Sequence, residues 1–168
     1  MNSKRIFGLL TALILVFSLG VSAYAENSTT ATVPVTLTVA NEYRAVNVTV
    51  PASLPIYVTN GTVITADNAR ITNNSKTGDV QVTSVSVTDG AYKIGNYENF
   101  SGHKTIALKI NGCPTVKSGP LKLTNSAFPV IDPGRDQDLK YFAKISKDAP
   151  NAKDVKAANV VFTISIVN

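Results

Sequence analysis

The sequence alternates apolar and polar residues along most of its length, and this alternation limits the folds that the chain can adopt. The stretch "ATVPVTLTVA" places Val33, Val35, Leu37 and Val39 at every second position. A period of two residues puts such side chains on one face of an extended strand. Helical spacing is rare, and only residues 148–158 could hold a helical turn. The pattern therefore predicts an all-β protein.

Two-residue turn signals separate the alternating runs. In "YVTNGTVIT" the alternation reaches Asn60-Gly61 and then resumes. Asn-Gly is favoured in a type I′ turn because both central residues need φ > 0, so this stretch predicts a β-hairpin. Asp89-Gly90 and Asn111-Gly112 end further runs. The spacing of these signals predicts a single-domain antiparallel β-sandwich or jelly roll of about nine to eleven strands.

One long alternating run changes phase in its middle. "DVQVTSVSVTDG" places Val80 and Val82 in one phase, and Val85 and Val87 in the other, with the change at Thr83-Ser84. One extra residue in a strand produces such a change, so the run predicts a β-bulge.

The first 25 residues have the features of a secretory signal peptide. Lys4 and Arg5 precede an apolar stretch, and Ala23-Tyr24-Ala25 supplies the small residues of a signal-peptidase site. We expect residues 1–25 to be removed, which leaves residues 26–168 as a secreted β-sandwich domain with no membrane span. Its localisation is then extracellular or at the cell surface.

Basic side chains gather in the second half of the chain. Residues 26–100 contain four basic and six acidic residues, whereas residues 101–168 contain ten and five. This excess favours an anionic neighbour such as a cell-wall or matrix polymer, although an ordinary solvated surface also explains it. No basic cluster is interleaved with aromatic residues, so nucleic acid is not an expected partner.

Side chains suited to catalysis or metal binding are sparse. His103 and Cys113 are the only histidine and cysteine, and their spacing matches no zinc site or Cys-His pair. We therefore expect no catalytic residue and no cofactor. Asp132, Asp136 and Asp138 form the one acidic cluster, "DPGRDQD", whose oxygens would suit calcium. Turn chemistry at Asp-Pro-Gly explains the same residues.

Aromatic residues offer a possible sugar-binding platform in "AYKIGNYENF". Tyr92, Tyr97 and Phe100 lie close together in this segment, and flat rings can stack on sugar rings. The alternative is that Tyr92 and Phe100 belong to the core while Tyr97 lies in a loop, since aromatic residues are common in sheet cores.

The segment "VNVTVPASLPIYVTNGTVITADNARITNNSKTGDVQVTSVSV" and the closing "AANVVFTISI" resemble a domain found in exported surface proteins of Gram-positive bacteria. More distantly, the layout is similar to that of the camelysin and biofilm-matrix fibre subunit family. The shared features are a leader, an early strand, an Asn-rich turn and a final strand of the form F-x-I. The resemblance implies an extracellular, non-enzymatic, adhesive or structural role.

Three functions are compatible with these observations. The first is adhesion or self-assembly at a bacterial surface or in a biofilm matrix, with a wall polymer or further copies of the chain as partner. The second is a carbohydrate-binding module that uses Tyr92, Tyr97 and Phe100. The third is a small hydrolase whose site is assembled only by folding.

The first mature strand suggests how self-assembly could occur. It follows a short polar tail, and Pro34 lacks the N–H that an inner strand needs, so we expect this strand at a sheet edge. Val33, Val35, Leu37 and Val39 would then fill a groove in a neighbouring copy by strand exchange. The alternative is that the strand remains in its own sheet.

Overall fold

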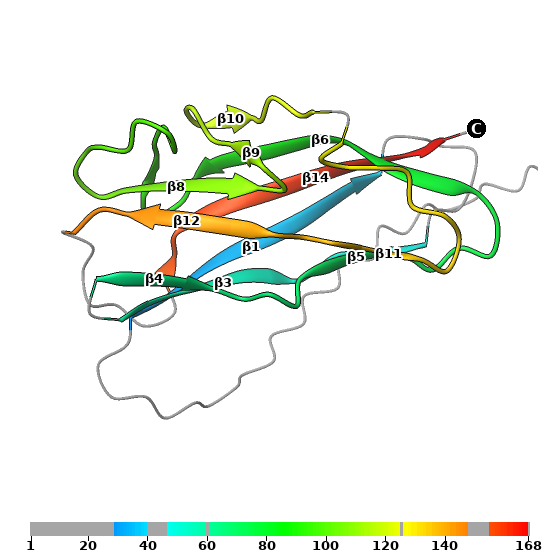
Figure 1. Cartoon of the computed structure of the whole chain (residues 1–168), viewed down its shortest axis with the longest axis horizontal. Helices are drawn as coiled ribbons and strands as arrows, with labels where there is room; N and C mark the ends of the chain where they lie inside the picture. Colours follow the sequence, from blue (N-terminus) through cyan, green and yellow to red (C-terminus); the bar gives the residue numbers. More distant parts are fainter. Residues whose placement is uncertain (1–28, 40–46, 60, 125, 148–154, 168) are drawn as a thin grey trace, which may run out of the picture.

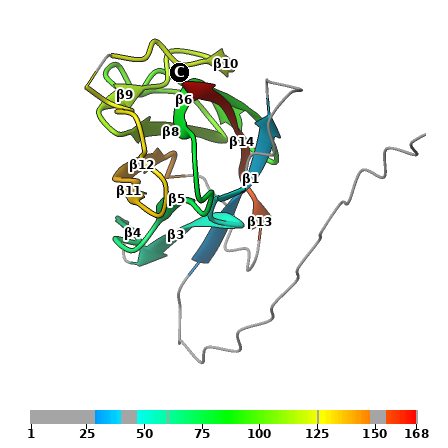
Figure 2. The same cartoon turned by 90° about the vertical axis from the view of Figure 1, so that its right-hand side faces the viewer.

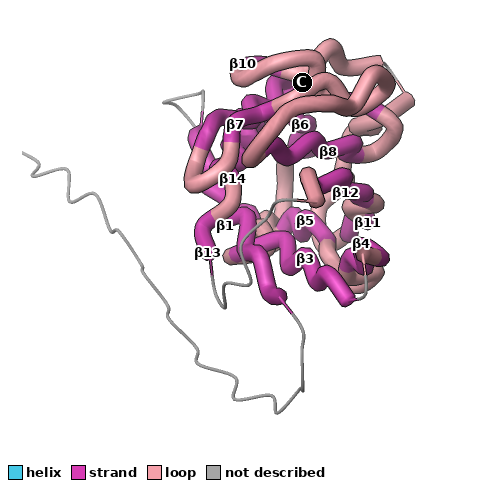
Figure 3. The backbone as a smooth tube through the Cα atoms, turned by 90° about the vertical axis from the view of Figure 1, so that its left-hand side faces the viewer, coloured by secondary structure: helices cyan, strands magenta, loops and turns pink. Residues whose placement is uncertain are grey.

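The fold consists of β-strands joined by turns and loops. The computed structural model describes residues 29–39, 47–59, 61–124, 126–147 and 155–167. These residues form fourteen strands and no helix, which confirms the predicted all-β sandwich (Figures 1 and 3). The strand count exceeds the expected one because five strands are only two residues long. No helix in this part of the chain is long and apolar enough to cross a membrane.

Seven strands make up the largest sheet. They lie in the order β10-β6-β14-β1-β3-β4, and β13 pairs with β1 outside this path. Their bounds are β1 Thr29–Val39, β3 Ser53–Thr59, β4 Thr62–Thr65, β6 Asp79–Asp89, β10 Gly119–Pro120, β13 Val155–Lys156 and β14 Ala158–Val167.

Two smaller sheets complete the structure. In the first, the order is β11-β5-β2; in the second, the order is β12-β8-β7, with β9 paired to β8. Their bounds are β2 Val48–Thr49, β5 Arg70–Asn73, β11 Asp136–Asp138, β7 Lys93–Ile94, β8 Thr105–Ile110, β9 Cys113–Pro114 and β12 Tyr141–Ile145. Figure 1 shows β8 and β12 in front of β6, β14 and β1, so the two layers face each other.

Strand β1 lies inside the large sheet, so the expectation of an edge position is wrong. Its first half pairs antiparallel with β3, as far as Pro34 opposite Ser53. Its second half pairs parallel with β14, starting with Val35 opposite Val160 (Figure 2). On the side of β1 that faces away from β3, the partner changes from β13, opposite Thr32, to β14, opposite Val35. Pro34 lies between these two pairings, so its missing N–H donor interrupts no ladder.

Parallel pairing is the main departure from the antiparallel sandwich expected from the sequence. Besides β1 with β14, the short strand β13 is parallel to β1 and β7 is parallel to β8. All the other strand pairs are antiparallel. Parallel neighbours need a crossover connection, so these pairs join segments that are distant in the sequence or separated by a loop.

The predicted bulge in β6 is confirmed. Opposite β14, Ser84 pairs with Thr163 and Val82 pairs with Ile164, so Thr83 is the extra residue. Val82 and Val85 are both buried although they are three residues apart. The extra residue shifts the alternation by one position, so the valines before and after the bulge all point into the core.

The Asn-Gly turns also lie where the sequence predicts hairpins. Thr59 pairs with Thr62, which leaves a two-residue turn in which Gly61 has φ of +77°. Asn60 lies outside the described residues. Asn111 and Gly112 both have positive φ, at 45° and 81°, and connect β8 to β9 as a type I′ turn does.

The core lies between the layers and includes side chains from all three sheets. Phe128 and Phe162 meet edge to face in it, with ring centroids 6.2 Å apart. Tyr141, from β12, is among the largest fully buried side chains. The loops and the outer sheet faces are thereby held on a rigid support.

Candidate functional site

The side chains of β1 face the core as the alternation predicted. Val33 is fully buried, and Val35 and Leu37 are partly buried against the core. Thr36, between them, is exposed. The backbone of Val39 pairs with Ile164, and the side chain of Val39 lies outside the described part of the chain. This strand therefore fills a groove between β3 and β14 within its own chain.

The three aromatic residues of the suggested platform do not share one surface. Tyr92 is only 2% exposed and belongs to the core, so its ring cannot stack on a ligand from outside. Phe100 and Tyr97 are half-buried in the segment that connects β7 to β8. The structure thus removes Tyr92 from the platform and leaves Tyr97 and Phe100 as surface candidates.

Two lysines approach the ring of Tyr97. The Nζ atom of Lys144, on β12, lies 4.5 Å from the ring centroid, and the Nζ atom of Lys109, on β8, lies 5.4 Å from it. Both distances allow a cation–π interaction. Lys144 also donates a hydrogen bond to the Tyr97 carbonyl at 2.7 Å, and Lys109 pairs with Glu98 at 3.0 Å.

A large apolar side chain lies beside these lysines. Phe142 is directly opposite Lys109 in the β8–β12 pairing, and it is 56% exposed. Phe142 and Lys144 are two residues apart on β12, so they project from the same face of the strand. We call Tyr97, Lys109, Phe142 and Lys144 the cation–aromatic face. The sequence contained part of this signal, because "LKYFAKIS" alternates lysine and phenylalanine with buried residues.

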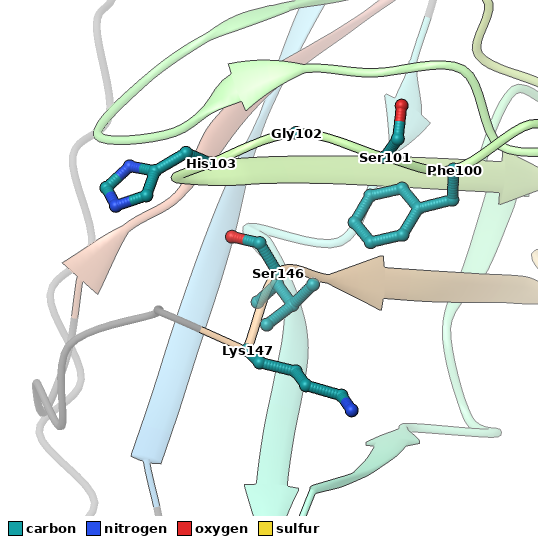
Figure 4. A pocket seen from close by; sticks show the side chains of 7 residues that line it. Phe100, Ser101, Gly102, His103, Ser146 and Lys147 are labelled. Atoms are coloured by element: carbon teal, nitrogen blue, oxygen red, sulfur yellow. The ribbon is translucent and has the colours of Figure 1, made fainter.

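A pocket of about 520 Å³ opens where β12 ends (Figure 4). Its lining comes from the segment before β8 and from the end of β12: Phe100, Ser101, Gly102, His103, Ile145, Ser146 and Lys147. Figure 4 shows the Ser101 hydroxyl and the His103 ring apart from each other, so they do not form a nucleophile–base pair. The Ser146 hydroxyl accepts a hydrogen bond from the Thr105 N–H at 3.0 Å.

The acidic cluster is spread over a turn and a strand. Asp136 and Asp138 flank the buried Gln137 on β11, and Asp136 pairs with Arg70 at 3.3 Å. Asp132 is exposed, and its carbonyl accepts a hydrogen bond from the Arg135 N–H at 3.1 Å in the preceding turn. Within the described residues, no group of three His, Cys, Asp or Glu side chains could hold a metal ion.

The single cysteine and the single histidine lie in different surroundings. Cys113 is buried and has a free thiol, directly after the Asn111-Gly112 turn. His103 is exposed in the loop before β8. The structure therefore does not bring these two residues together into one site.

The chain was also compared with known proteins. A scan against protein-family models found no match, and searches of curated proteins and of solved structures found none either.

Proposed function

We propose that the protein is a secreted, non-enzymatic surface or matrix protein that assembles with further copies of itself by exchanging strand β1. The observation that supports the proposal is the position of β1. This strand begins the described part of the chain, yet it lies between β3 and β14 in the middle of the large sheet. After removal of residues 1–25, which is part of this proposal, a strand in such a position can be supplied by another copy without changing the contacts that it makes.

The groove that β1 occupies is suited to this exchange. Without β1, strands β3 and β14 would each present unpaired N–H and C=O groups along one side. The core would also lose Val33, which is fully buried, together with Val35 and Leu37. A vacant groove is therefore unstable and is filled either by the chain's own β1 or by that of a neighbour.

Exchange would produce an open chain of subunits. Each copy donates β1 at one place and accepts a strand at another, which makes the contact heterologous. Such contacts generate filaments whenever the rotation between subunits does not close a ring. This outcome agrees with the resemblance to fibre subunits, and the location outside the cell is part of the same proposal.

A disulfide that locks β1 into its own chain tests the proposal. Thr36 and Val161 are paired on neighbouring strands, and neither is fully buried. Neighbouring strands lie about 4.8 Å apart, within the Cα separation that a disulfide accepts. The variant Thr36→Cys/Val161→Cys of residues 26–168 is followed by light scattering while the protein concentration is raised.

We expect the oxidised variant to remain monomeric and the same variant, once reduced, to polymerise like the wild type. The reduced sample is the matched control, because it has the same sequence and differs only in the bond. If the wild type remains monomeric at high concentration, strand exchange is refuted. Polymerisation of the oxidised variant would show that assembly uses another surface.

Adhesion to a wall or matrix polymer is a second candidate function. It is favoured by the contact between Lys144 and Tyr97, which combines a cation with an aromatic ring on an outer sheet face. Adhesion and assembly use different parts of the molecule, since β12 belongs to the smaller sheet and β1 to the larger one. The two functions are therefore compatible.

A further inference from the structure

We propose that the cation–aromatic face, together with the pocket at the end of β12, binds an acidic polysaccharide. The choice of a polysaccharide rests on the proposed extracellular function. The face consists of Tyr97, Lys109, Phe142 and Lys144, and the pocket adds Phe100 and Lys147.

The aromatic part of the face offers apolar area to a sugar ring. Phe142 exposes more than half of its side chain on a regular strand, where the sheet below fixes its position. The Tyr97 backbone N–H donates a hydrogen bond to the Thr115 carbonyl at 2.9 Å, which anchors the segment that holds its ring. Rigid rings lose little entropy when a ligand stacks on them.

The charged part of the face is positive. Lys109 and Lys144 contribute two positive charges. Glu98 pairs with Lys109 and offsets one of them. An ammonium group has three N–H donors. The Lys144 ammonium donates to a neutral carbonyl, so its charge is not neutralised by that contact. Charge complementarity therefore favours an anionic ligand.

The pocket and the face are built from the same two segments. Residues 97–103 supply Tyr97 to the face and Phe100 to the pocket, and β12 with the residues that follow it supplies Lys144 to the face and Lys147 to the pocket. Figure 4 shows the Phe100 ring between its own segment and β12, with Lys147 on the β12 side of the pocket. An extended polymer that lies on the face can thus place one of its units in the pocket.

The spacing of the face suits a repeating polymer. Residues two apart on a strand lie about 6.8 Å from each other, so Phe142 and Lys144 present a ring and then a charge along one line. A polymer of acidic sugars presents apolar C–H faces and carboxylates in a repeating order. Stacking and ion pairing are then satisfied by the same ligand.

The test measures binding of residues 26–168 to immobilised polygalacturonate, with neutral galactan as the uncharged control. We expect binding to polygalacturonate only, and a marked loss of affinity between 0.05 M and 0.5 M salt, because exposed ion pairs are screened. A single-stranded oligothymidylate tests the other class of polyanion that has flat rings. Equal or tighter binding of the oligothymidylate, or of the galactan, would overturn the proposal.

Variants assign the binding to the face. Lys144→Gln and Lys109→Gln should each weaken binding about threefold to fivefold, and Phe142→Ala about as much, which is typical of exposed contacts. Lys144→Arg retains the charge and should retain most of the affinity. Lys76→Gln removes one equal charge from the turn between β5 and β6 and should leave affinity unchanged. Melting temperatures confirm that each variant is folded.

The proposal fails if Lys76→Gln weakens binding as much as Lys144→Gln does, since binding would then depend only on net charge. It also fails if Phe142→Ala leaves the affinity unchanged. Assembly is measured separately by light scattering on the same samples. If the protein binds the polysaccharide without polymerising, strand exchange fails and this proposal stands. If it polymerises without binding the polysaccharide, this proposal fails and strand exchange stands.

Discussion

The hydroxyl of Tyr141 donates a hydrogen bond to the carbonyl oxygen of Pro55 at 2.6 Å and so connects strand β12 to strand β3. The Tyr141 hydroxyl oxygen also accepts a hydrogen bond from the backbone N–H of Ala66 at 3.1 Å. One phenol thus ties the sheet that holds the cation–aromatic face to the sheet that holds β1. The contact joins residues that are far apart in the sequence, and it makes the relative position of the two layers specific.

Removal of this hydroxyl should destabilise the fold. We expect Tyr141→Phe to lower the free energy of unfolding by about 1 to 2 kcal/mol, because the Pro55 carbonyl and the Ala66 N–H lose their partner in a part-buried place. Urea unfolding measures the difference. Tyr57→Phe, which alters an exposed tyrosine in the same way, is the matched control and should cost little. Equal losses for the two variants would contradict the prediction.

The same residue predicts a pH dependence. Burial raises the pKa of Tyr141 above its ordinary value of 10.0, the Ala66 N–H opposes this rise, and Tyr57 adds to it. The unfolded chain therefore loses the phenol proton first. The stability that Tyr141 contributes is complete below about pH 10 and is lost as the pH rises through the folded-state pKa.

Unfolding curves measured at several pH values test this sign. The difference in unfolding free energy between the wild type and Tyr141→Phe should be constant up to about pH 9 and shrink above about pH 10. The prediction is wrong if the difference in unfolding free energy between the two proteins stays constant over the alkaline range. Tyr141 would then have the same pKa in the folded and in the unfolded chain.

The β3–β4 turn requires glycine for its backbone conformation. Gly61 has φ of +77°, and a Cβ atom there would meet nothing within 4 Å. Gly61→Val should therefore cost more than about 1 kcal/mol through strain alone. Gly61→Asn is the control, since asparagine tolerates positive φ, and it should cost less. If Gly61→Val melts at the wild-type temperature, this account of the turn is wrong.

The bulge in β6 predicts that loss of its extra residue is tolerated better than loss of a paired residue of the same strand. Removal of Thr83 leaves "VQVSVSV", in which Val80, Val82, Val85 and Val87 alternate without a bulge, so all four can remain buried. Removal of Ser86 instead puts Val87 out of phase with Val85 and turns it outward, which costs about 1.5 to 3 kcal/mol of burial. Thr83→Ala keeps the residue count and should change stability by less than about 1 kcal/mol. Circular dichroism melting compares the three variants, and a larger loss from removal of Thr83 than from removal of Ser86 would contradict the prediction.

Metal removal should have no effect on stability. Asp136 is paired with Arg70, and no metal-binding group of three side chains occurs among the described residues. We expect the melting temperature of residues 26–168 to be the same with EDTA and with added calcium. A large fall with EDTA would show that Asp132, Asp136 and Asp138 bind a cation after all.

The strands and their inward faces could be predicted from local patterns. The alternation in "TVPVTLTV" gave the buried side of β1 at Val33, and the phase change at Thr83 gave the bulge, because both are consequences of the two-residue period. The position of β1 could not be predicted. Pro34 indicates that a donor is missing, but nothing local distinguishes a sheet edge from a change of partner.

The candidate site was only partly predictable for the same reason. The burial of Tyr92 follows from its alternation with Ile94, which is buried too. The surroundings of Tyr97 do not follow from its own segment, because Lys109 and Lys144 come from two other strands. Contacts of this kind depend on the order of strands in the sheet, which the sequence pattern does not determine.

The pairing of β1 with β14 also sets the order of events when a new chain folds. Synthesis runs from the N-terminus, so β1 is completed well before β14, and the ladder from Val35 opposite Val160 can form only after the chain has been made as far as Val160. Contacts between such distant segments slow folding. A newly made chain therefore has an interval in which its first strand is present without its parallel neighbour, and encounters between molecules during that interval decide whether the strand returns to its own sheet.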